Sequence, residues 1–257
     1  MSKYFATKSR NVNENTDHIL SIKKLYKSFG ENKVLIDFNL DLSKKQNIVV
    51  LGKSGSGKSV LIKCIIGLLK PDTGTIELFN ENITELNSEE LDIIRSKVGF
   101  LFQSNALYDS MTVRENLEFP LRRHWINYAQ NKVDAMVLEA LNDVQLSHTI
   151  DMMPAELSGG MRKRIALART LILKPEIILY DEPTTGLDPI TGKEIIQLMI
   201  EIKDKYGTAA LIISHDMNCV KLASDYVVIL LEGKCYAYGK YEELKKNQDE
   251  KIRQFFE

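Results

Sequence analysis

The stretch that decides the fold begins at residue 47 and reads Asn47-Ile48-Val49-Val50-Leu51-Gly52-Lys53-Ser54-Gly55-Ser56-Gly57-Lys58-Ser59-Val60. Its apolar, largely β-branched beginning predicts a buried strand. The glycines that follow allow backbone N–H groups to turn inward around phosphate oxygens, and the helix predicted from Ser59 adds the positive end of its dipole. This order of strand, glycine-rich loop and helix predicts a phosphate-binding loop over residues 52–60. Lys58 would place its charge on the outer phosphates, and the Ser59 hydroxyl could ligate Mg²⁺.

A second strand ends in two adjacent carboxylates and reads Ile177-Ile178-Leu179-Tyr180-Asp181-Glu182. Two neighbouring acids at a buried strand end are costly unless a cation or a reaction uses them. We expect Asp181 to hold Mg²⁺ through water. We expect Glu182, one residue further, to face the γ-phosphate and polarise an attacking water.

The rest of the chain alternates helical and strand patterns. Strands are predicted at 75–79, 98–102, 210–213, 226–231 and 234–238, with short strands and turns between 19 and 50. Helices are predicted at 59–69, within 112–145, at 162–173 and at 190–206, with a charged helix at the end. The two apolar strands around the helix 190–206 form a βαβ unit, which indicates a parallel sheet covered on both faces.

Composition restricts the possible functions. The 257 residues are 44% hydrophobic and have a formal net charge of −1, so no overall field favours nucleic acid or an anionic membrane. No apolar stretch approaches the roughly 20 residues that span a bilayer. The polar segment 1–18 has no apolar centre typical of a secretory signal, and we expect a disordered lead there. The three cysteines are widely spaced, which predicts neither disulfides nor a zinc site. These features predict a soluble, cytosolic protein.

A further motif, Leu157-Ser158-Gly159-Gly160-Met161, precedes the helix 162–173. It resembles the signature motif of ABC ATPases, usually LSGGQ, and it would form a second anion-binding helix N-terminus. Other positions resemble the same family. By that resemblance, Phe29 would stack on adenine, with Tyr26 as the alternative, and Gln103 would contact Mg²⁺ and water. Asp188, in Gly186-Leu187-Asp188, would belong to the D-loop at the dimer interface, and His215 would contact the γ-phosphate.

The resemblance extends from about Ile19 to Tyr241 and implies an α/β fold with a P-loop NTPase (RecA-like) core. An N-terminal antiparallel β-subdomain and an inserted α-helical subdomain, about 104–170, are expected within one ATPase domain at 19–241. A helical tail would follow at 242–257. The resemblance also implies ATP and Mg²⁺ as cofactors, and a homodimer in which each signature closes over the ATP bound to its neighbour. The dimer would lie on the cytoplasmic face of the membrane, beneath an integral membrane permease.

Three local features are similar to the ATPase subunit of Mla/Mce-type phospholipid transporters. Val60 stands where most ABC ATPases have Thr, and Met161 replaces the usual Gln of the signature. The third feature is the segment 102–113 with Phe119-Pro120-Leu121. An MCE-domain lipid-binding protein and a STAS-domain subunit would then be further partners. Asn105, where this subgroup often has Gly, and the short charged tail depart from its pattern.

Three alternatives compete with this hypothesis. An ATPase of an amino-acid or other small-solute importer would share every catalytic residue. ABC ATPases of DNA repair, chromosome structure or translation need a second nucleotide domain, a long coiled-coil insertion or zinc modules, and the sequence shows none of them. A non-hydrolysing regulatory protein would not need Glu182 and His215.

Overall fold

The computed structural model describes residues 18–123 and 128–257. The strands are β1 (His18–Phe29), β2 (Asn32–Ser43), β3 (Asn47–Leu51), β4 (Thr73–Leu78), β5 (Glu81–Asn82), β6 (Val98–Leu101), β7 (Ile177–Asp181), β8 (Ala209–Ser214), β9 (Tyr226–Leu231) and β10 (Lys234–Gly239). The α-helices are α1 (Lys58–Ile65), α2 (Ser88–Ser96), α3 (Val113–Arg123), α4 (Gln130–Asp143), α5 (Gly159–Leu171), α6 (Pro189–Tyr206), α7 (Met217–Ala223), α8 (Tyr241–Lys245) and α9 (Glu250–Arg253). Short 3-10 turns lie at Ser147–Thr149 and Pro154–Glu156.

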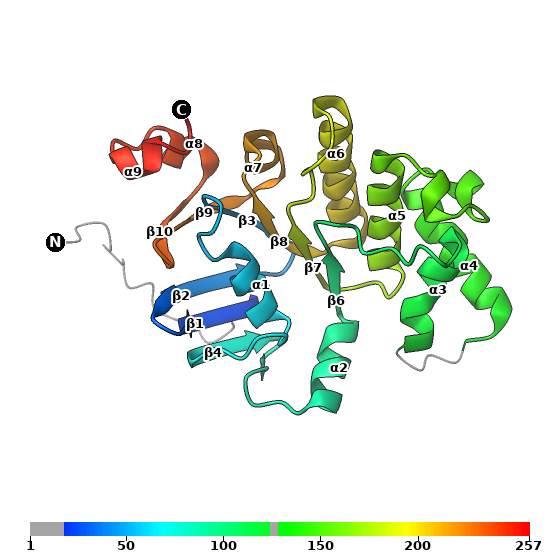
Figure 1. Cartoon of the computed structure of the whole chain (residues 1–257), viewed down its shortest axis with the longest axis horizontal. Coiled ribbons are helices and arrows are strands. Elements are labelled where there is room, and N and C mark those ends of the chain that lie inside the picture. The colour runs from blue at the N-terminus through cyan, green and yellow to red at the C-terminus, as the bar shows by residue number, and fades with distance from the viewer. Residues whose placement is uncertain (1–17, 124–127) are drawn as a thin grey trace.

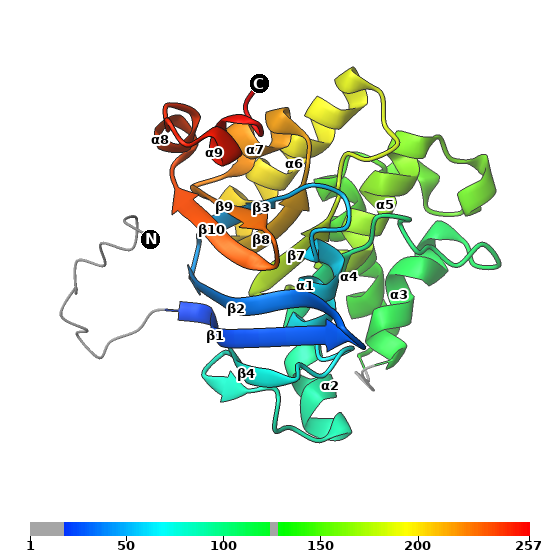
Figure 2. The ribbon, with the colours of Figure 1, turned by 60° about the vertical axis from the view of Figure 1, so that its left-hand side comes forward.

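The strands form two sheets, which Figures 1 and 2 show from two directions. One has the order β2-β1-β4-β5 and is antiparallel; the other has the order β10-β9-β3-β8-β7-β6. In the second sheet β9, β3, β8, β7 and β6 run parallel, and β10 pairs antiparallel with β9. The carboxyl ends of the parallel strands therefore meet at one edge, where ligands of open α/β sheets bind.

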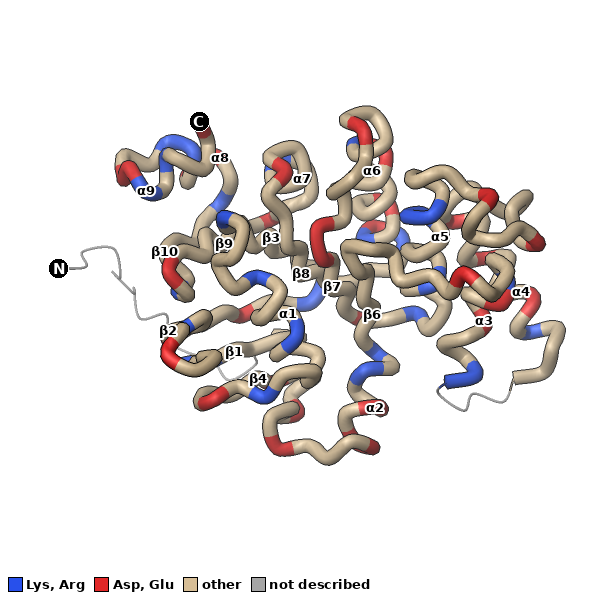
Figure 3. Tube along the Cα trace, in the orientation of Figure 1, with Lys and Arg blue, Asp and Glu red and all other residues tan. Residues whose placement is uncertain are grey.

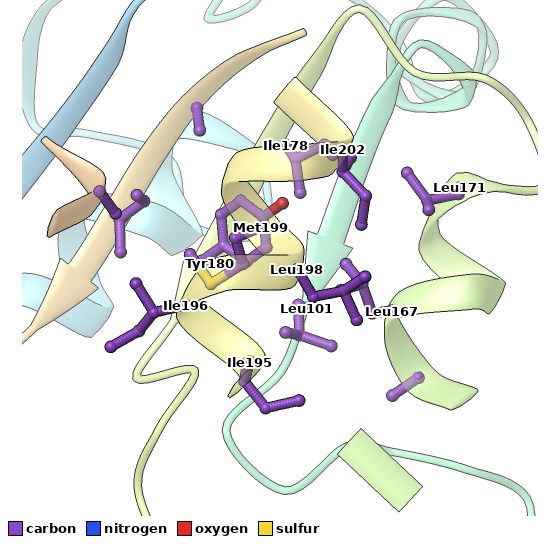
Figure 4. Packing of buried hydrophobic residues seen from close by; sticks show 14 of the residues in the cluster. Leu101, Leu167, Leu171, Ile178, Tyr180, Ile195, Ile196, Leu198, Met199 and Ile202 are labelled. Carbon is purple, nitrogen blue, oxygen red and sulfur yellow. The ribbon is translucent and has the colours of Figure 1, made fainter. Parts of the chain in front are cut away.

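Two hydrophobic cores lie on opposite faces of the parallel sheet. Because side chains alternate along a strand, Ile48 and Val50 of β3 point into one core, while Val49 and Leu51 point into the other. The first core places α1 between the two sheets. The second core joins the sheet to α5, α6 and α7, and Figure 4 shows Ile178 and Tyr180 among the side chains of α5 and α6. This burial on both faces explains the continuous apolar strands.

The predicted α/β fold with a P-loop NTPase core is confirmed, and four local predictions need correction. β1 and β2 are strands of 12 residues each and form one long hairpin rather than short strands. α1 ends at Ile65 rather than Leu69, because Gly67 takes a positive φ and the N–H of Leu68 returns to the carbonyl of Lys63. The helical pattern 112–145 is two helices, α3 and α4. The charged end contains two short helices, α8 and α9, in place of one.

Two helices were not predicted. α2 is held at its start by a capping box, in which the Asn87 side chain accepts from the N–H groups of Glu89 and Glu90, and Glu90 accepts from the N–H of Asn87. α7 begins at Met217 and is capped by Asp216, whose carboxylate accepts from the N–H of Asn218. α7 packs against α6 and places the turn after β8 at the edge of the sheet.

The segment 104–170 contains α3, α4, both 3-10 turns and most of α5, and it lies beside β6, away from the antiparallel sheet (Figure 1). The lead segment predicted at 1–18 falls outside the described residues except for His18, which begins β1. Within 18–123 and 128–257, no helix has the length and apolar character needed to cross a bilayer. Figure 3 shows Lys and Arg interspersed with Asp and Glu along the described chain.

Candidate functional site: a phosphate loop facing an acidic strand end

The phosphate-binding loop connects the end of β3 to the start of α1. Gly57 precedes the helix with φ 102°, and a Cβ at this position would lie 2.9 Å from the Val34 carbonyl, so only glycine fits. The side chain of Lys58 folds back over the loop. Its Nζ donates to the carbonyls of Gly52, at 2.8 Å, and Lys53, at 3.1 Å. The loop therefore holds a buried cation at its own centre.

The carboxylate of Glu182 lies between this lysine and a histidine. Its Oε1 is 3.9 Å from Lys58 Nζ, and its Oε2 is 2.7 Å from Nδ1 of His215. The three residues follow β3, β7 and β8, which are neighbours in the sheet, so their carboxyl ends bring the side chains together. Glu182 has φ 51°, a left-handed conformation that costs energy for a non-glycine residue and is often found at functional sites. Thr185 Oγ1 donates to Glu182 Oε2 at 3.4 Å.

Asp181, the last residue of β7, precedes Glu182 and is partly buried. Burial raises the pKa of its carboxyl, and the neighbouring Glu182 raises it further, whereas Lys58, Lys63 and Lys163 oppose the rise. Its Oδ1 is buried without a hydrogen-bond partner. Burial also lowers the pKa of Lys58, against the attraction of Glu182 and Asp181. A divalent cation at Asp181 would satisfy the lone oxygen and compensate the excess negative charge.

A cleft of about 470 Å³ opens in front of Asp181 and is lined by Phe102, Gln103, Ser104, Asp181 and Thr185. Gln103 therefore shares this cleft with Asp181. The described residues contain no cluster of three or more His, Cys, Asp or Glu side chains suited to a metal ion. The predicted donors are instead one carboxylate, the Ser59 hydroxyl and the Gln103 amide, a set that suits Mg²⁺ bound jointly by protein and phosphate oxygens.

Two further residues of the loop have other surroundings. Val60 is partly buried and packs against the core around α1, so its side chain faces that core. The exposed Lys53 donates from Nζ to Gln254 Oε1 at 3.3 Å, which places the chain end beside the loop.

The signature residues lie apart from this loop of the same chain. Ser158 caps α5 by accepting from the N–H of Met161 at 3.2 Å, and Ser158 and Gly159 are exposed. α5 packs against β6, whereas the phosphate loop follows β3, three positions away in the sheet. Three strand spacings amount to about 14 Å. The structure thus brings Lys58, Asp181, Glu182, His215 and Gln103 together and leaves the signature outside the group.

Asp188 lies beside the signature and caps α6. Its carboxylate accepts from the N–H groups of Ile190 and Thr191 and from the Thr191 hydroxyl, the last at 2.6 Å. A Cβ at Gly160 would lie 2.6 Å from Thr191 Cγ2. The glycine therefore allows close contact between the signature and the start of α6.

The two candidate aromatic residues lie on β1. Phe29 ends the strand with 49% of its surface exposed, and Tyr26 is 37% exposed. Asp72, which was not predicted, fixes the backbone between them: it accepts from the N–H of Ser28 at 2.6 Å and from Lys27 Nζ at 2.9 Å. Its own N–H donates to the carbonyl of Tyr26. Both aromatic side chains therefore remain open to solvent.

Lys163 on α5 was also missed as a functional candidate. Its side chain is only 1% exposed, and its Nζ donates to the carbonyls of Gln103 at 3.0 Å and Phe102 at 3.4 Å. Helical spacing places it on the same side of α5 as the buried Ala166 and Leu167. This spacing is the feature of the sequence that indicates an inward-facing lysine.

A nucleotide hydrolase with a P-loop is the class of protein that this fold and site define. Residues 35–185 match the ABC transporter family. The chain is 39% identical over 92% of its length to a probable ribonucleotide transport ATP-binding protein of Mycobacterium leprae, covering 68% of that protein. It is 35% identical over 93% of its length to an intermembrane phospholipid transport system ATP-binding protein, MlaF, of Haemophilus influenzae, covering 90% of it. The chain therefore belongs to the ABC transporter family, whose members bind ATP, and it is an ATP hydrolase.

Solved structures agree with this assignment. One is a dimeric ATP-binding cassette in a post-hydrolysis state, bound to ADP and Pi. The match covers 86% of this chain and 98% of the cassette's chain, with a TM-score of 0.78 and 32% identity. Another is a subunit of an ABC transporter complex from Clostridium perfringens. The match covers 93% of this chain and 94% of that subunit's chain, with a TM-score of 0.83 and 29% identity.

Proposed function

We propose that the chain is the motor of a phospholipid transporter, working as one of a pair that hydrolyses ATP beneath a membrane permease. The position of Glu182 between Lys58 and His215 is the observation that supports hydrolysis most directly. The MlaF relative, of which the chain covers 90%, supports phospholipid as the transported class.

Glu182 is suited to act on the water that attacks the γ-phosphorus. His215 Nδ1 holds Oε2 of this carboxylate, so the side chain has one orientation from which to accept a proton. Lys58 would leave its loop carbonyls for the phosphates and stabilise the charge of the transition state. Asp181, Ser59 and Gln103 would hold Mg²⁺, which supplies further positive charge at the phosphate oxygens.

The distance between signature and phosphate loop supports the paired arrangement. About 14 Å of sheet separates β6, against which α5 packs, from β3, which leads into the phosphate loop. This spacing supports a signature that acts outside the phosphate loop of its own chain. A second copy placed head to tail would bring its own Ser158 hydroxyl and helix N-terminus onto that phosphate. The dimeric cassette among the solved relatives supports this arrangement.

The permease would bind beside the Q-loop, the turn at Gln103. A groove of about 260 Å³ is lined by Ile66, Leu68, Asp92, Arg95, Val98, Phe100, Phe102 and Arg123. Most of these side chains are apolar, and Asp92 pairs with both arginines, with Arg95 at 3.1 Å and with Arg123 at 3.6 Å. This lining suits a permease segment with apolar side chains. Phe102 lines both this groove and the cleft at Asp181, so it connects the two sites directly.

The test is to express the tagged chain in its native cell, extract the membranes with mild detergent and identify the proteins that co-purify. The proposal expects a multi-pass permease, together with an MCE-domain protein and a STAS-domain subunit, and ATP hydrolysis that responds to phospholipid. A Leu68→Asp variant should lose the permease and retain ATP binding, which would locate the docking groove.

Other outcomes separate the proposal from its alternative. Recovery of an amino-acid permease with a solute-binding protein would favour a small-solute importer. That alternative has some support, since the chain is 33% identical to a methionine import ATP-binding protein of Campylobacter jejuni and covers 75% of it.

A further inference from the structure

We propose that Lys163 and Arg169 are positioning residues that attach the main chain of the Q-loop to α5, the helix that begins at the signature. Gln103 would then be placed against Asp181 by the same rigid element that presents Ser158 to the partner. This inference rests on the proposed hydrolytic function and identifies residues that act through Gln103.

Lys163 forms the first attachment. A buried ammonium group is costly unless it has strong hydrogen bonds. Its two acceptors are main-chain carbonyls, those of Phe102 and Gln103, rather than the side chain of an acid. Burial lowers the pKa of Lys163 to about 8, although the charge of Asp181 opposes this change. A hydrophobic side chain would fill this buried position in α5 at a lower free-energy cost. The lysine therefore contributes something other than packing, namely its hydrogen bonds to the Q-loop.

Arg169 forms the second attachment, six residues or about one and two-thirds turns further along α5. Its Nη1 donates to the carbonyl of Ala106 at 2.8 Å and its Nη2 to that of Asn105 at 3.0 Å. Asn105 and Ala106 both have positive φ, 65° and 51°, a pair of left-handed residues that the chain adopts only under constraint. The planar guanidinium presents a separate nitrogen to each of the two neighbouring carbonyls in a fixed geometry, whereas Lys163 reaches its two carbonyls with one nitrogen.

A third side chain of α5, that of Thr170, continues the same line of contacts. Thr170 Oγ1 donates to the carbonyl of Phe100 at 3.3 Å, so α5 contacts the chain from the end of β6 through the Q-loop to residue 106. α5 also begins at the signature, with Ser158 as its cap. Lys163 lies five residues beyond Ser158, about 7.5 Å along the helix axis. Any shift of the signature when two copies close would therefore displace the Q-loop as well.

The other basic residues of the motif have different partners. Arg162 Nη1 donates to the carbonyl of Leu157, and Arg164 pairs with Glu194 and with the carbonyl of Val144. Neither contacts the Q-loop in these bonds. Lys163 is thus distinguished from its two neighbours by where it points.

The test compares Lys163→Met, Lys163→Arg and Arg169→Lys with the parent chain, with Lys174→Met as matched control. Lys174 follows α5 and pairs on the surface with Glu139. Lys163→Met should lower kcat for ATP by about tenfold or more, with KM for ATP within twofold of the parent, and should raise the Mg²⁺ concentration needed for half-maximal rate. Lys163→Arg, which retains a buried donor, should recover much of kcat, and Arg169→Lys should show a smaller loss of the same kind.

Hydrogen–deuterium exchange gives a second measurement that needs no activity. Amides of residues 102–106 should exchange faster in Lys163→Met than in the parent or in Lys174→Met, with no nucleotide present. If Lys163→Met does not fold, the kinetics and the hydrogen–deuterium exchange of Arg169→Lys test the inference instead.

Parent-like kcat, Mg²⁺ dependence and exchange in a folded variant would overturn the inference. A parent chain that hydrolyses no ATP would instead contradict the proposed function, and exchange at 102–106 would still test the attachment.

Discussion

Nδ1 of His215 lies 2.7 Å from Oε2 of Glu182, although the two residues follow different strands. The other oxygen of the same carboxylate lies 3.9 Å from Lys58 Nζ. One carboxylate thus has a separate neighbour for each oxygen, which fixes both its position and its orientation.

Glu182→Gln should lower kcat for ATP hydrolysis by about 10²-fold or more, because an amide does not accept the proton of the attacking water. ATP binding should persist, since the phosphate loop is unchanged. Steady-state phosphate release and equilibrium nucleotide binding would check this. Glu176→Gln, an exposed carboxylate just before the same strand, is the matched control. A Glu182→Gln variant as fast as the parent would remove Glu182 from the catalytic assignment.

Phe29→Ala should weaken ATP binding by roughly fivefold or more, the lower range for loss of one aromatic stacked on a base. Tyr26→Ala should have a smaller effect. The comparison matters because both rings are exposed on β1 and only one is expected to stack on adenine. Equilibrium dialysis with ATP and with inorganic triphosphate separates base contacts from phosphate contacts. Equal losses in both variants, or a larger loss for Tyr26→Ala, would transfer the role to Tyr26.

Gly160→Ala should reduce the free energy of unfolding by about 1–3 kcal/mol, the usual cost of forcing a methyl group into a packed position. The new Cβ would lie 2.6 Å from Thr191 Cγ2. Thr191→Ser removes that methyl group and retains the hydroxyl bound to Asp188, so the double variant should recover much of the loss. Gly159→Ala has open space around it and serves as control, with Leu187 as its nearest contact at 4.0 Å. Chemical denaturation would compare the parent chain, Gly160→Ala, the Gly160→Ala/Thr191→Ser double variant and Gly159→Ala. A Gly160→Ala variant as stable as the parent would contradict the predicted contact.

The cysteine thiols should react slowly in the folded protein at pH 8. Burial raises the pKa of Cys64 to about 11 and of Cys219 to about 12. A raised thiol pKa means less thiolate, so at pH 8 the reactive form is scarcer than in an unfolded chain, by about two orders of magnitude for Cys64 and about three for Cys219. Iodoacetamide labelling followed by peptide mass spectrometry would measure the rates, with urea-unfolded protein as reference. The rate should rise with pH well beyond 8, and equal rates in folded and unfolded protein would refute the burial argument.

Much of the site could be predicted from sequence because its residues stand next to recognisable elements. The phosphate loop, Asp181, Glu182 and His215 each follow an apolar strand, and parallel strands bring such positions to one edge. α2 was missed although Asn87 and Glu90 form a capping pair, since its single buried residue, Ile94, gave no helical periodicity.

Lys163 and Asp72 could not be predicted in the same way. Lys163 bonds to a residue 60 positions earlier, and Asp72 to one 44 positions earlier. Helical spacing indicates that Lys163 faces inward, but the partners of both residues depend on tertiary contacts that neither periodicity nor local motifs encode. The early end of α1, by contrast, had a local signal in Gly67, whose left-handed conformation ends helices.

The place of β3 in its sheet has a consequence for biosynthesis. β3 pairs only with β8 and β9, so the strand that leads into the phosphate loop has no partner until residues beyond 209 have left the ribosome. The β1–β2 hairpin can form early from local contacts, whereas the parallel sheet must wait for distant ones and folds slowly. An apolar strand exposed during that delay is prone to aggregate. Premature termination before β8 would thus produce an insoluble fragment that depends on chaperones, rather than a folded cassette lacking activity.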